Sequence, residues 1–182
     1  MKKLIIWMID DEPIYHKQAR EGLANVAKQL PVTCVIKSSC DWQWPPELNI
    51  IGQDGTEKKD EQPLAQLPDI LILDLFESAM TFRGKIFYEE LRKHETKENR
   101  RLHQEREKNH SGTFVIEAEA REAQPSGAFV IIWSNYWSHS DSINFVKQAR
   151  MQDNRFVAIE TKAPSLLEEA VKGCISRIEE ER

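Results

Sequence analysis

The residues best suited to chemistry lie within or directly after short apolar runs of the chain. Asp10 and Asp11 follow the first run, Asp74 lies near the end of a central run, and Ser134 and Lys162 follow two later runs. Three carboxylates brought together would repel one another unless a cation neutralised them, and oxygen ligands of this kind favour Mg²⁺. A lysine ammonium and a hydroxyl beside such a site would bind a phosphoryl group. Asp74 is then the natural nucleophile, and it would form an acyl phosphate.

Five apolar runs predict the strands that must position these residues. Apolar runs that are continuous rather than alternating are typical of strands covered on both faces, as in parallel sheets. Helical patterns lie between them, from Pro13 to Leu30, from Ser142 to Arg150 and from Ser165 to Ile178. This alternation predicts an α/β fold with a parallel sheet, in which the carboxyl ends of the strands share one edge. The runs are Leu4–Ile9, Val32–Ile36, Ile70–Phe76, Ala128–Trp133 and Phe156–Ile159.

Length and composition narrow the class of protein. The chain has 182 residues, a formal net charge of −5 and 30% charged residues, which suits a single domain over 1–182. Mild acidity argues against a main role in binding phosphate backbones, so we expect no nucleic-acid partner. Three cysteines without a CxxC pair indicate neither a disulfide framework nor a zinc site. The apolar runs are too short to cross a bilayer, so we expect a cytoplasmic protein without membrane contact.

Two regions break the regular alternation of strands and helices, and we interpret both as insertions. Residues 38–67 are rich in turn formers and give only a poor second helix. In residues 92–127 a helical pattern that begins at Ile86 becomes almost wholly polar, with Leu102 as the one apolar residue up to Asn109. This stretch is interpreted as a helical extension with ion pairs facing solvent, or as a mobile loop.

Three aromatic residues outside the candidate site have ordinary explanations. Trp42 and Trp44 stand beside two prolines, and loop packing is a simpler interpretation than a partner-binding patch. His16 lies near the start of the first predicted helix and is expected on the surface. None of the five histidines lies in a metal-binding pattern.

The order of the motifs along the chain resembles that of the receiver domain of two-component response regulators. The match covers roughly residues 1–91 and 127–182, and it implies a flavodoxin-like, doubly wound sheet of five parallel strands in the order 2-1-3-4-5. The matching segments are Asp10-Asp11-Glu12-Pro13 for the acidic pair, Leu71-Ile-Leu-Asp74-Leu for the phosphoacceptor strand, Val130-Ile-Ile-Trp-Ser134 for the strand ending in a hydroxyl residue, and Ala158-Ile-Glu-Thr-Lys162 for the strand carrying the invariant lysine.

The resemblance also implies a metal site and its ligands. Asp11 and Asp74 would bind Mg²⁺ directly, together with the main-chain carbonyl of Phe76, while Asp10 would act through water.

A function and its partners follow from the same resemblance. Asp74 would accept a phosphoryl group from a histidine kinase or a phosphotransfer protein, and Ser134 and Lys162 would bind the oxygens of that group. Because the last predicted helix fills the chain to Arg182, we expect a stand-alone receiver that is not an enzyme. Its output would be the binding of an unidentified protein, with a homodimer left open.

Three positions depart from the family pattern. Ala163 separates Lys162 from Pro164, so this loop is expected to take another path that displaces the lysine. Ile159 replaces an aromatic switch residue, and Asn135 replaces a small residue. These departures leave open a receiver-like interaction module that no longer switches. A haloacid-dehalogenase-like phosphatase is less favoured, because that family has its nucleophile on the first strand and its acidic pair last.

Overall fold

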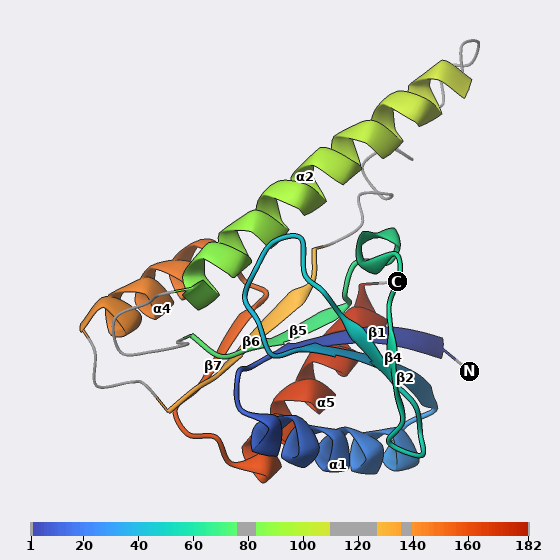
Figure 1. The fold of residues 1–182 in the computed structure, drawn as a ribbon. Coiled ribbons are helices and arrows are strands. Elements are labelled where there is room, and N and C mark those ends of the chain that lie inside the picture. Colours follow the sequence, from blue (N-terminus) through green and yellow to red (C-terminus); the bar gives the residue numbers. More distant parts are fainter. Residues whose placement is uncertain (1, 76–82, 110–126, 136–139, 182) are drawn as a thin grey trace.

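The computed structural model describes residues 2–75, 83–109, 127–135 and 140–181. They form a mixed α/β fold with one mostly parallel sheet between helices, as the alternation of patterns predicts (Figure 1). The strands are β1 (Lys2–Ile9), β2 (Val32–Ser39), β3 (Asn49–Ile51), β4 (Glu57–Lys59), β5 (Ile70–Leu73), β6 (Phe129–Trp133) and β7 (Phe156–Ile159). The helices are α1 (Pro13–Gln29), α2 (Arg83–Asn109), α4 (Ser140–Gln152) and α5 (Pro164–Glu180), with a short 3₁₀ helix at Pro63–Ala65.

The sheet is wider than the sequence predicts. Five strands run parallel, and two short antiparallel strands extend the sheet beyond β2, giving the order β4-β3-β2-β1-β5-β6-β7. The predicted sheet of five strands in the order 2-1-3-4-5 is therefore wrong in its width and in its complete order. The two added strands come from residues 38–67, where the sequence pattern predicts a poor helix.

A tight turn explains why this region forms a hairpin. The N–H of Gly52 donates to the carbonyl of Thr56 at 2.7 Å, and Gly55 has a φ of 82°, which residues with a side chain rarely adopt. Beyond the hairpin, Asp60 accepts a hydrogen bond from the buried ammonium of Lys37 at 2.7 Å. Because Lys37 belongs to β2, this ion pair secures the hairpin to the edge of the parallel strands.

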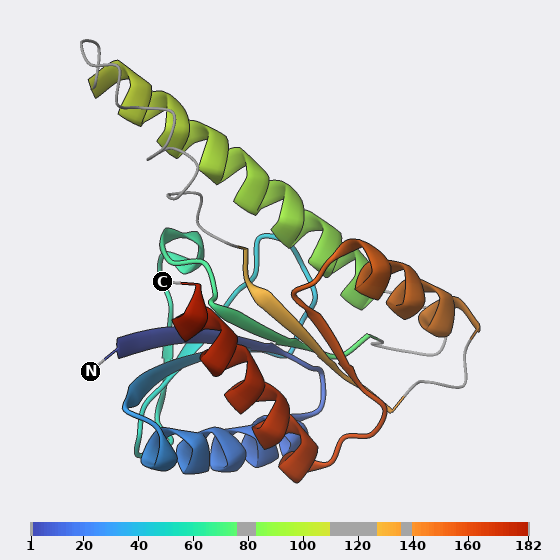
Figure 2. The same cartoon turned by 180° about the vertical axis from the view of Figure 1, so that it is seen from behind.

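Helices cover both faces of the sheet. α1 and α5 lie on one face, and α2 and α4 lie on the other (Figure 1, Figure 2). The core under α1 and α5 includes Leu23 and Val171, and the core under α2 and α4 includes Phe87 and Val146. Successive residues of a strand point to opposite faces, so β1 must be apolar at every position from Leu4 to Ile9 to fill both cores. Its residues divide as Leu4, Ile6 and Met8 on one face and Ile5, Trp7 and Ile9 on the other.

α2 extends well beyond the sheet (Figure 1). It contains 27 residues, so the predicted insertion at 92–127 is helical as far as Asn109, and residues 110–126 lie outside the described residues. Phe87 and Leu91 are fully buried against the sheet, whereas the described side chains after Leu102 are exposed. None of the described helices has both the length and the apolar character needed to span a membrane.

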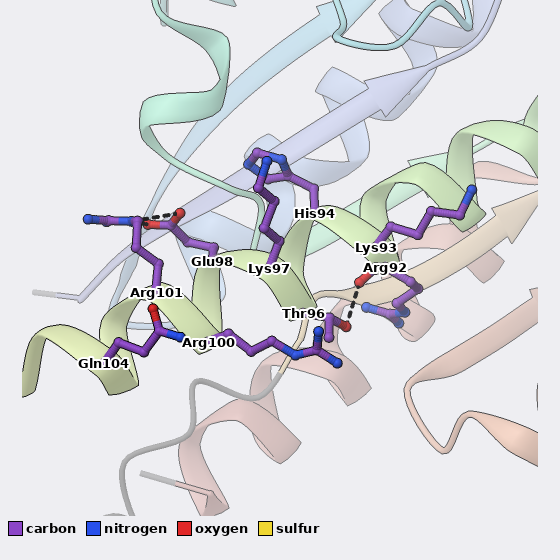
Figure 3. A pocket seen from close by; sticks show the side chains of 9 residues that line it. All are labelled: Arg92, Lys93, His94, Thr96, Lys97, Glu98, Arg100, Arg101 and Gln104. Atoms are coloured by element: carbon purple, nitrogen blue, oxygen red, sulfur yellow. Dashed lines mark hydrogen bonds and ion pairs between the residues drawn. The ribbon is translucent and has the colours of Figure 1, made fainter. Parts of the chain in front are cut away.

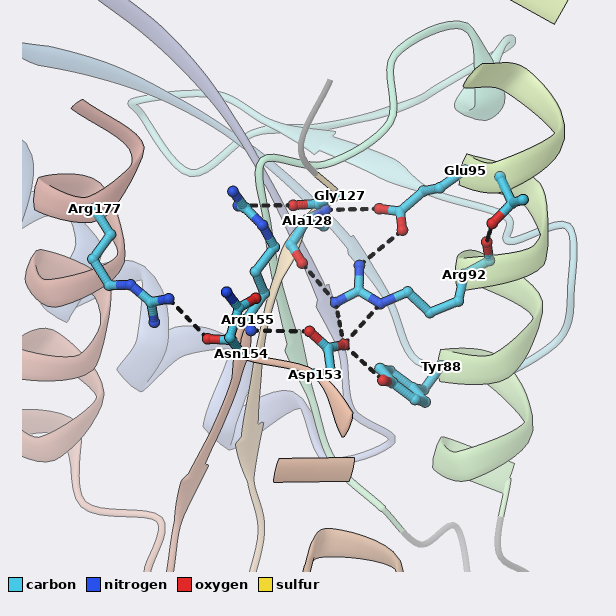
Figure 4. Close-up of polar contacts among 10 residues, drawn as sticks. Tyr88, Arg92, Glu95, Gly127, Ala128, Asp153, Asn154, Arg155 and Arg177 are labelled. Atoms are coloured by element: carbon cyan, nitrogen blue, oxygen red, sulfur yellow. Dashed lines mark hydrogen bonds and ion pairs between the residues drawn. The ribbon is translucent and has the colours of Figure 1, made fainter. Parts of the chain in front are cut away.

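A polar network fixes the middle of α2 to the sheet (Figure 4). The guanidinium of Arg92 donates to Asp153 at 2.8 Å, to Glu95 at 2.7 Å and to the carbonyl of Ala128 at 2.8 Å. Glu95 in turn accepts from the N–H of Ala128, and the hydroxyl of Tyr88 donates to Asp153. Burial alone would raise the pKa of Asp153, but its hydrogen bonds and the charge of Arg92 hold that pKa below its usual value.

Replacing Arg92 by methionine is expected to lower the free energy of unfolding by about 3 kcal/mol, because Glu95 and Asp153 lose their cation while they stay largely buried. Since the pKa of Asp153 is depressed, its contribution is present above the unfolded pKa and is lost as the pH falls through the folded one. Urea denaturation at neutral and acidic pH measures both effects. Lys93→Met is the control, because that ammonium is exposed and pairs with Glu90. Equal losses for the two variants would contradict this role of the network.

Candidate functional site

The carboxyl edge of the sheet carries the predicted site residues. Asp10 directly follows β1, Asp74 directly follows β5 and Ser134 directly follows β6, while Lys162 lies in the loop between β7 and α5. The register aligns the last residues of β1 and β5, and β6 extends one residue further. The N–H of Asp74 also donates to the carbonyl of Ile9 at 3.0 Å. Parallel pairing therefore brings residues that are far apart in sequence to one edge.

Asp10, Asp11 and Asp74 form a carboxylate cluster, in which one oxygen from each residue lies within 4.8 Å of the others. Asp10 and Asp74 are buried, and Asp11 is half-buried. One oxygen of Asp74 accepts from the N–H of Leu75 at 2.8 Å, and one oxygen of Asp10 accepts from the N–H of Glu12 at 2.9 Å. The Oδ1 atom of Asp11 is shielded from solvent and has no hydrogen-bond partner among the described residues. A donor set made of oxygens, one of them unpartnered, fits a hard divalent cation.

The ammonium of Lys162 lies between two of these carboxylates. Its Nζ atom donates to Oδ2 of Asp10 at 2.6 Å and to Oδ2 of Asp74 at 3.1 Å. The same atom lies 3.8 Å from the centroid of the Tyr15 ring, whose face attracts a cation. Because the lysine side chain is only 2% exposed, little solvent screens these interactions.

Ala163 does not displace Lys162, so that expectation is wrong. Ala163 serves as the N-cap of α5 and Pro164 as its first residue, a position that tolerates proline. The N–H of Lys162 donates to the side-chain carbonyl of Asn135 at 2.9 Å, and the amide of Asn135 donates to the hydroxyl of Tyr15 at 3.2 Å. In the sequence, Asn135 is notable only as a departure from the family pattern. In the structure, its side chain connects this loop to the end of β6.

Burial and charge set the protonation of the cluster. Burial raises the pKa of Asp10 to about 6, with Lys162 opposing the change and Asp74 adding to it. Burial also raises the pKa of Asp11. Burial would lower the pKa of Lys162, but the charges of Asp74 and Asp10 outweigh it and raise that pKa. The lysine therefore stays charged at neutral pH, and it supplies one positive charge to three carboxyl groups.

The ionisation of Asp10 is expected to cost stability in protein freed of divalent cations. Because folding raises the pKa of Asp10 from its ordinary value of 3.8 to about 6, the protonated form favours the folded state. This contribution is present below pH 3.8 and is lost as the pH rises through about 6. Urea denaturation across this interval should therefore show Asp10→Asn gaining stability relative to the wild type. A difference that stays constant with pH would contradict the expectation.

The structure gives less information on the two remaining predicted site residues, Ser134 and Phe76. Ser134 is fully buried at the same edge of the sheet as Asp74. Phe76, whose carbonyl is the remaining expected metal ligand, lies outside the described residues.

Two ring N–H groups that sequence reasoning did not assign to the site bind its main chain. The ring of His16 is buried rather than on the surface as expected, and its Nε2 bonds to the carbonyl of Asp10 at 2.5 Å. The indole of Trp42 donates to the carbonyl of Asp74 at 3.0 Å. Burial lowers the pKa of His16 and so favours the neutral ring. No spacing signal points to either residue, since both contacts depend on the tertiary fold.

A hollow of about 830 Å³ along α2 is separate from the carboxylate cluster (Figure 3). Its basic side chains are partly neutralised within the helix, as the ion pairs of Arg101 with Glu98 and Glu105 show. These pairs three and four residues apart agree with the interpretation of this stretch as a solvent-facing helix. The lining residues are Arg92, Lys93, His94, Thr96, Lys97, Glu98, Arg100, Arg101 and Gln104.

No protein-family model matches this chain, and no curated protein matches it in sequence. What the site can do follows from its own groups, which are a buried carboxylate, an ammonium in contact with it and two further carboxylates suited to a cation. Together these groups suit the transfer of a phosphoryl group to a carboxylate.

Proposed function

We propose that this chain is a signalling protein of the receiver type, which accepts a phosphoryl group on Asp74 with Mg²⁺ as its cofactor. The observation that carries the proposal is the position of Lys162, whose Nζ lies 3.1 Å from Oδ2 of Asp74 across 88 residues of sequence. A carboxylate acceptor needs such an ammonium, because negative charge builds up on the phosphoryl oxygens during transfer. Asp10 and Asp11, next to Asp74, complete the carboxylate cluster that would hold the cation.

The arrangement of the strands supports this proposal. Without β3 and β4, the parallel strands stand in the order β2-β1-β5-β6-β7, with helices on both faces. We infer that β3 and β4 are an addition to a flavodoxin-like, doubly wound core. In such sheets ligands bind outside the carboxyl ends of the strands, which is where the carboxylate cluster lies.

Asp74 is the residue best placed to act as the nucleophile. The N–H of Leu75 holds one carboxylate oxygen and Lys162 contacts the other, so the orientation of the group is fixed. In the proposed reaction an Asp74 oxygen attacks the phosphorus of a phosphohistidine in a histidine kinase or a phosphotransfer protein. The P–N bond breaks as the P–O bond forms, its electron pair passes to the imidazole, and the leaving nitrogen takes up a proton. Lys162 and Ser134 then bind the phosphoryl oxygens.

The residues present fit a magnesium ion. Asp11 and Asp74 are the proposed direct ligands together with the carbonyl of Phe76, and Asp10 acts through water. The unpartnered Oδ1 of Asp11 supports this assignment, because a shielded carboxylate oxygen without a donor is costly unless a cation neutralises it. When bound, Mg²⁺ neutralises the carboxylates and the charge on the transferred group.

The proposal is tested by incubating the protein with acetyl phosphate and Mg²⁺ and measuring its intact mass. The wild type should gain the mass of one phosphoryl group, and Asp74→Asn should gain none. Glu160→Gln is the matched control, because Glu160 is an exposed carboxylate next to β7. Protein that shows neither a mass gain nor a spectral response to beryllofluoride with Mg²⁺ would instead fit a receiver-like interaction module. Rapid turnover of a phosphate ester would instead fit a phosphatase.

A further inference from the structure

The main-chain carbonyl of Asp74 is bound by a residue from outside the parallel strands. Trp42 lies in the loop 40–48 between β2 and β3, and its indole N–H donates to this carbonyl at 3.0 Å. The indole is 3% exposed and Asp74 is 1% exposed. Removing the donor would leave a buried carbonyl without this bond, which disfavours the present main-chain orientation.

The start of α2 approaches the same carbonyl. A Cβ atom at Gly84 would lie 2.4 Å from the Asp74 oxygen and 2.7 Å from the Cα of Leu75, so the two backbones are in close contact there. The N–H of Gly84 also donates to the carbonyl of Leu75 at 3.1 Å. The main chain after β5 is therefore in contact with both loop 40–48 and α2, and a shift at Asp74 must move one of them.

Loop 40–48 also contacts α2 directly. The ring of Trp44 lies 5.4 Å from the ring of Phe87 in an edge-to-face arrangement and 5.7 Å from the ring of His94. Asp41 in the same loop lies 4.0 Å from the guanidinium of Arg83. These contacts connect the loop to the first turns of α2.

We propose that Trp42 is a positioning residue for the phosphoacceptor Asp74, and that Trp44 transmits changes at Asp74 to α2. This inference rests on the proposed function for its regulatory meaning. Phosphorylation changes the charge and hydrogen bonding of Asp74, its carbonyl shifts, and the bonded indole follows. Because Trp42 and Trp44 are two residues apart in one loop, that movement changes the contact of the Trp44 ring with Phe87.

The positioning role is tested by comparing Trp42→Phe with Trp7→Phe. Trp7 is the matched control because it is buried in the same core and its indole N–H has no hydrogen-bond partner among the described residues. Trp42→Phe should slow phosphoryl uptake from acetyl phosphate and weaken Mg²⁺ affinity, each about fivefold, as expected for losing one hydrogen bond. Trp7→Phe should change both by less than about twofold.

Amide and indole NMR spectra separate positioning from a merely structural role. Adding beryllofluoride with Mg²⁺ should shift the Trp42 indole resonance and the amides at 83–95, and leave the Trp7 indole unchanged. In Trp44→Leu the Trp42 indole should still shift, while the amides at 87–95, which lie beyond the direct contact of Gly84 with Asp74, no longer respond. If those amides respond as in the wild type, Trp44 does not transmit the change.

Different results would contradict the positioning role of Trp42 and the proposed function. A wild type that takes up no phosphoryl group contradicts the proposed function, and the positioning role is then decided by the Mg²⁺ affinity of Trp42→Phe. A folded Trp42→Phe with the uptake rate and Mg²⁺ affinity of Trp7→Phe overturns the positioning role, even when the wild type is phosphorylated.

Discussion

Lys162→Met is expected to lower the free energy of unfolding of the cation-free protein by about 4 kcal/mol at neutral pH. Of the described residues, Lys162 alone forms ion pairs with Asp10 and Asp74, and the side chains of all three are at most 7% exposed. Methionine keeps most of the length of the side chain but removes its charge. The buried carboxyl groups of Asp10 and Asp74 then lose their cation, and Asp10 must take up a proton or stay charged without compensation. Either outcome is far more costly than losing an exposed ion pair.

Mg²⁺ should restore much of this loss, because a cation bound only to the folded protein adds about 2.7 kcal/mol at a hundredfold excess over its dissociation constant. Urea denaturation with and without Mg²⁺ measures both effects. Lys172→Met on α5 is the control, since its half-exposed ammonium pairs with Glu168 four residues away. We expect it to cost about 0.5 kcal/mol or less and not to respond to Mg²⁺. Similar losses for both variants would mean that the buried ion pairs contribute little.

Gly84→Ala is expected to lower the free energy of unfolding by about 3 kcal/mol. The new methyl group would lie 2.4 Å from the Asp74 oxygen, 2.7 Å from the Cα of Leu75 and 3.0 Å from the carbonyl oxygen of Leu75. All three are main-chain atoms, so no side-chain rotation relieves the overlap. The start of α2 or the end of β5 must shift, and Mg²⁺ affinity should fall with stability because Asp74 moves.

Gly173→Ala is the matched control for this substitution. Gly173 is exposed in the middle of α5, and a Cβ atom there would meet nothing within 4 Å. Alanine favours the helix more than glycine does, so this variant should gain about 0.5 to 1 kcal/mol without a change in Mg²⁺ affinity. Thermal or urea denaturation distinguishes the two variants by sign. A gain for Gly84→Ala as well would show that the contact with Asp74 is looser than described.

The parallel strands β5 and β6 were predictable because burial on both faces makes every position apolar. Ile70–Leu73 and Phe129–Trp133 are fully buried at each residue, and the sequence shows the same unbroken runs. The two added strands were not predictable, since each has three residues and β4 contains no apolar residue at all. Segments so short show no period, and only the pairing of β3 with β2 and of β4 with β3 makes them strands.

The carboxylates were predictable, whereas their surroundings were not. Asp10 and Asp74 follow strands whose carboxyl ends must meet, so their proximity follows from the fold class. The position of Lys162 depends on a loop that Asn135 holds from another strand, and no local pattern records that contact. The same holds for Trp42, whose neighbouring prolines suggested loop packing while its N–H binds the main chain of Asp74. Contacts of this kind require the tertiary structure.

The hairpin of β3 and β4 also decides what the sheet offers to other molecules. An edge strand presents unpaired backbone groups that another chain can bind, and long apolar edges invite aggregation. The hairpin pairs with β2 at Ile36, Lys37 and Ser38, and the new edge strand, β4, reads Glu57-Lys58-Lys59 with all three side chains exposed. Short, charged edges resist strand pairing between chains. The insertion thus protects this edge of the sheet from strand pairing between chains, and we expect no homodimer to form through β4.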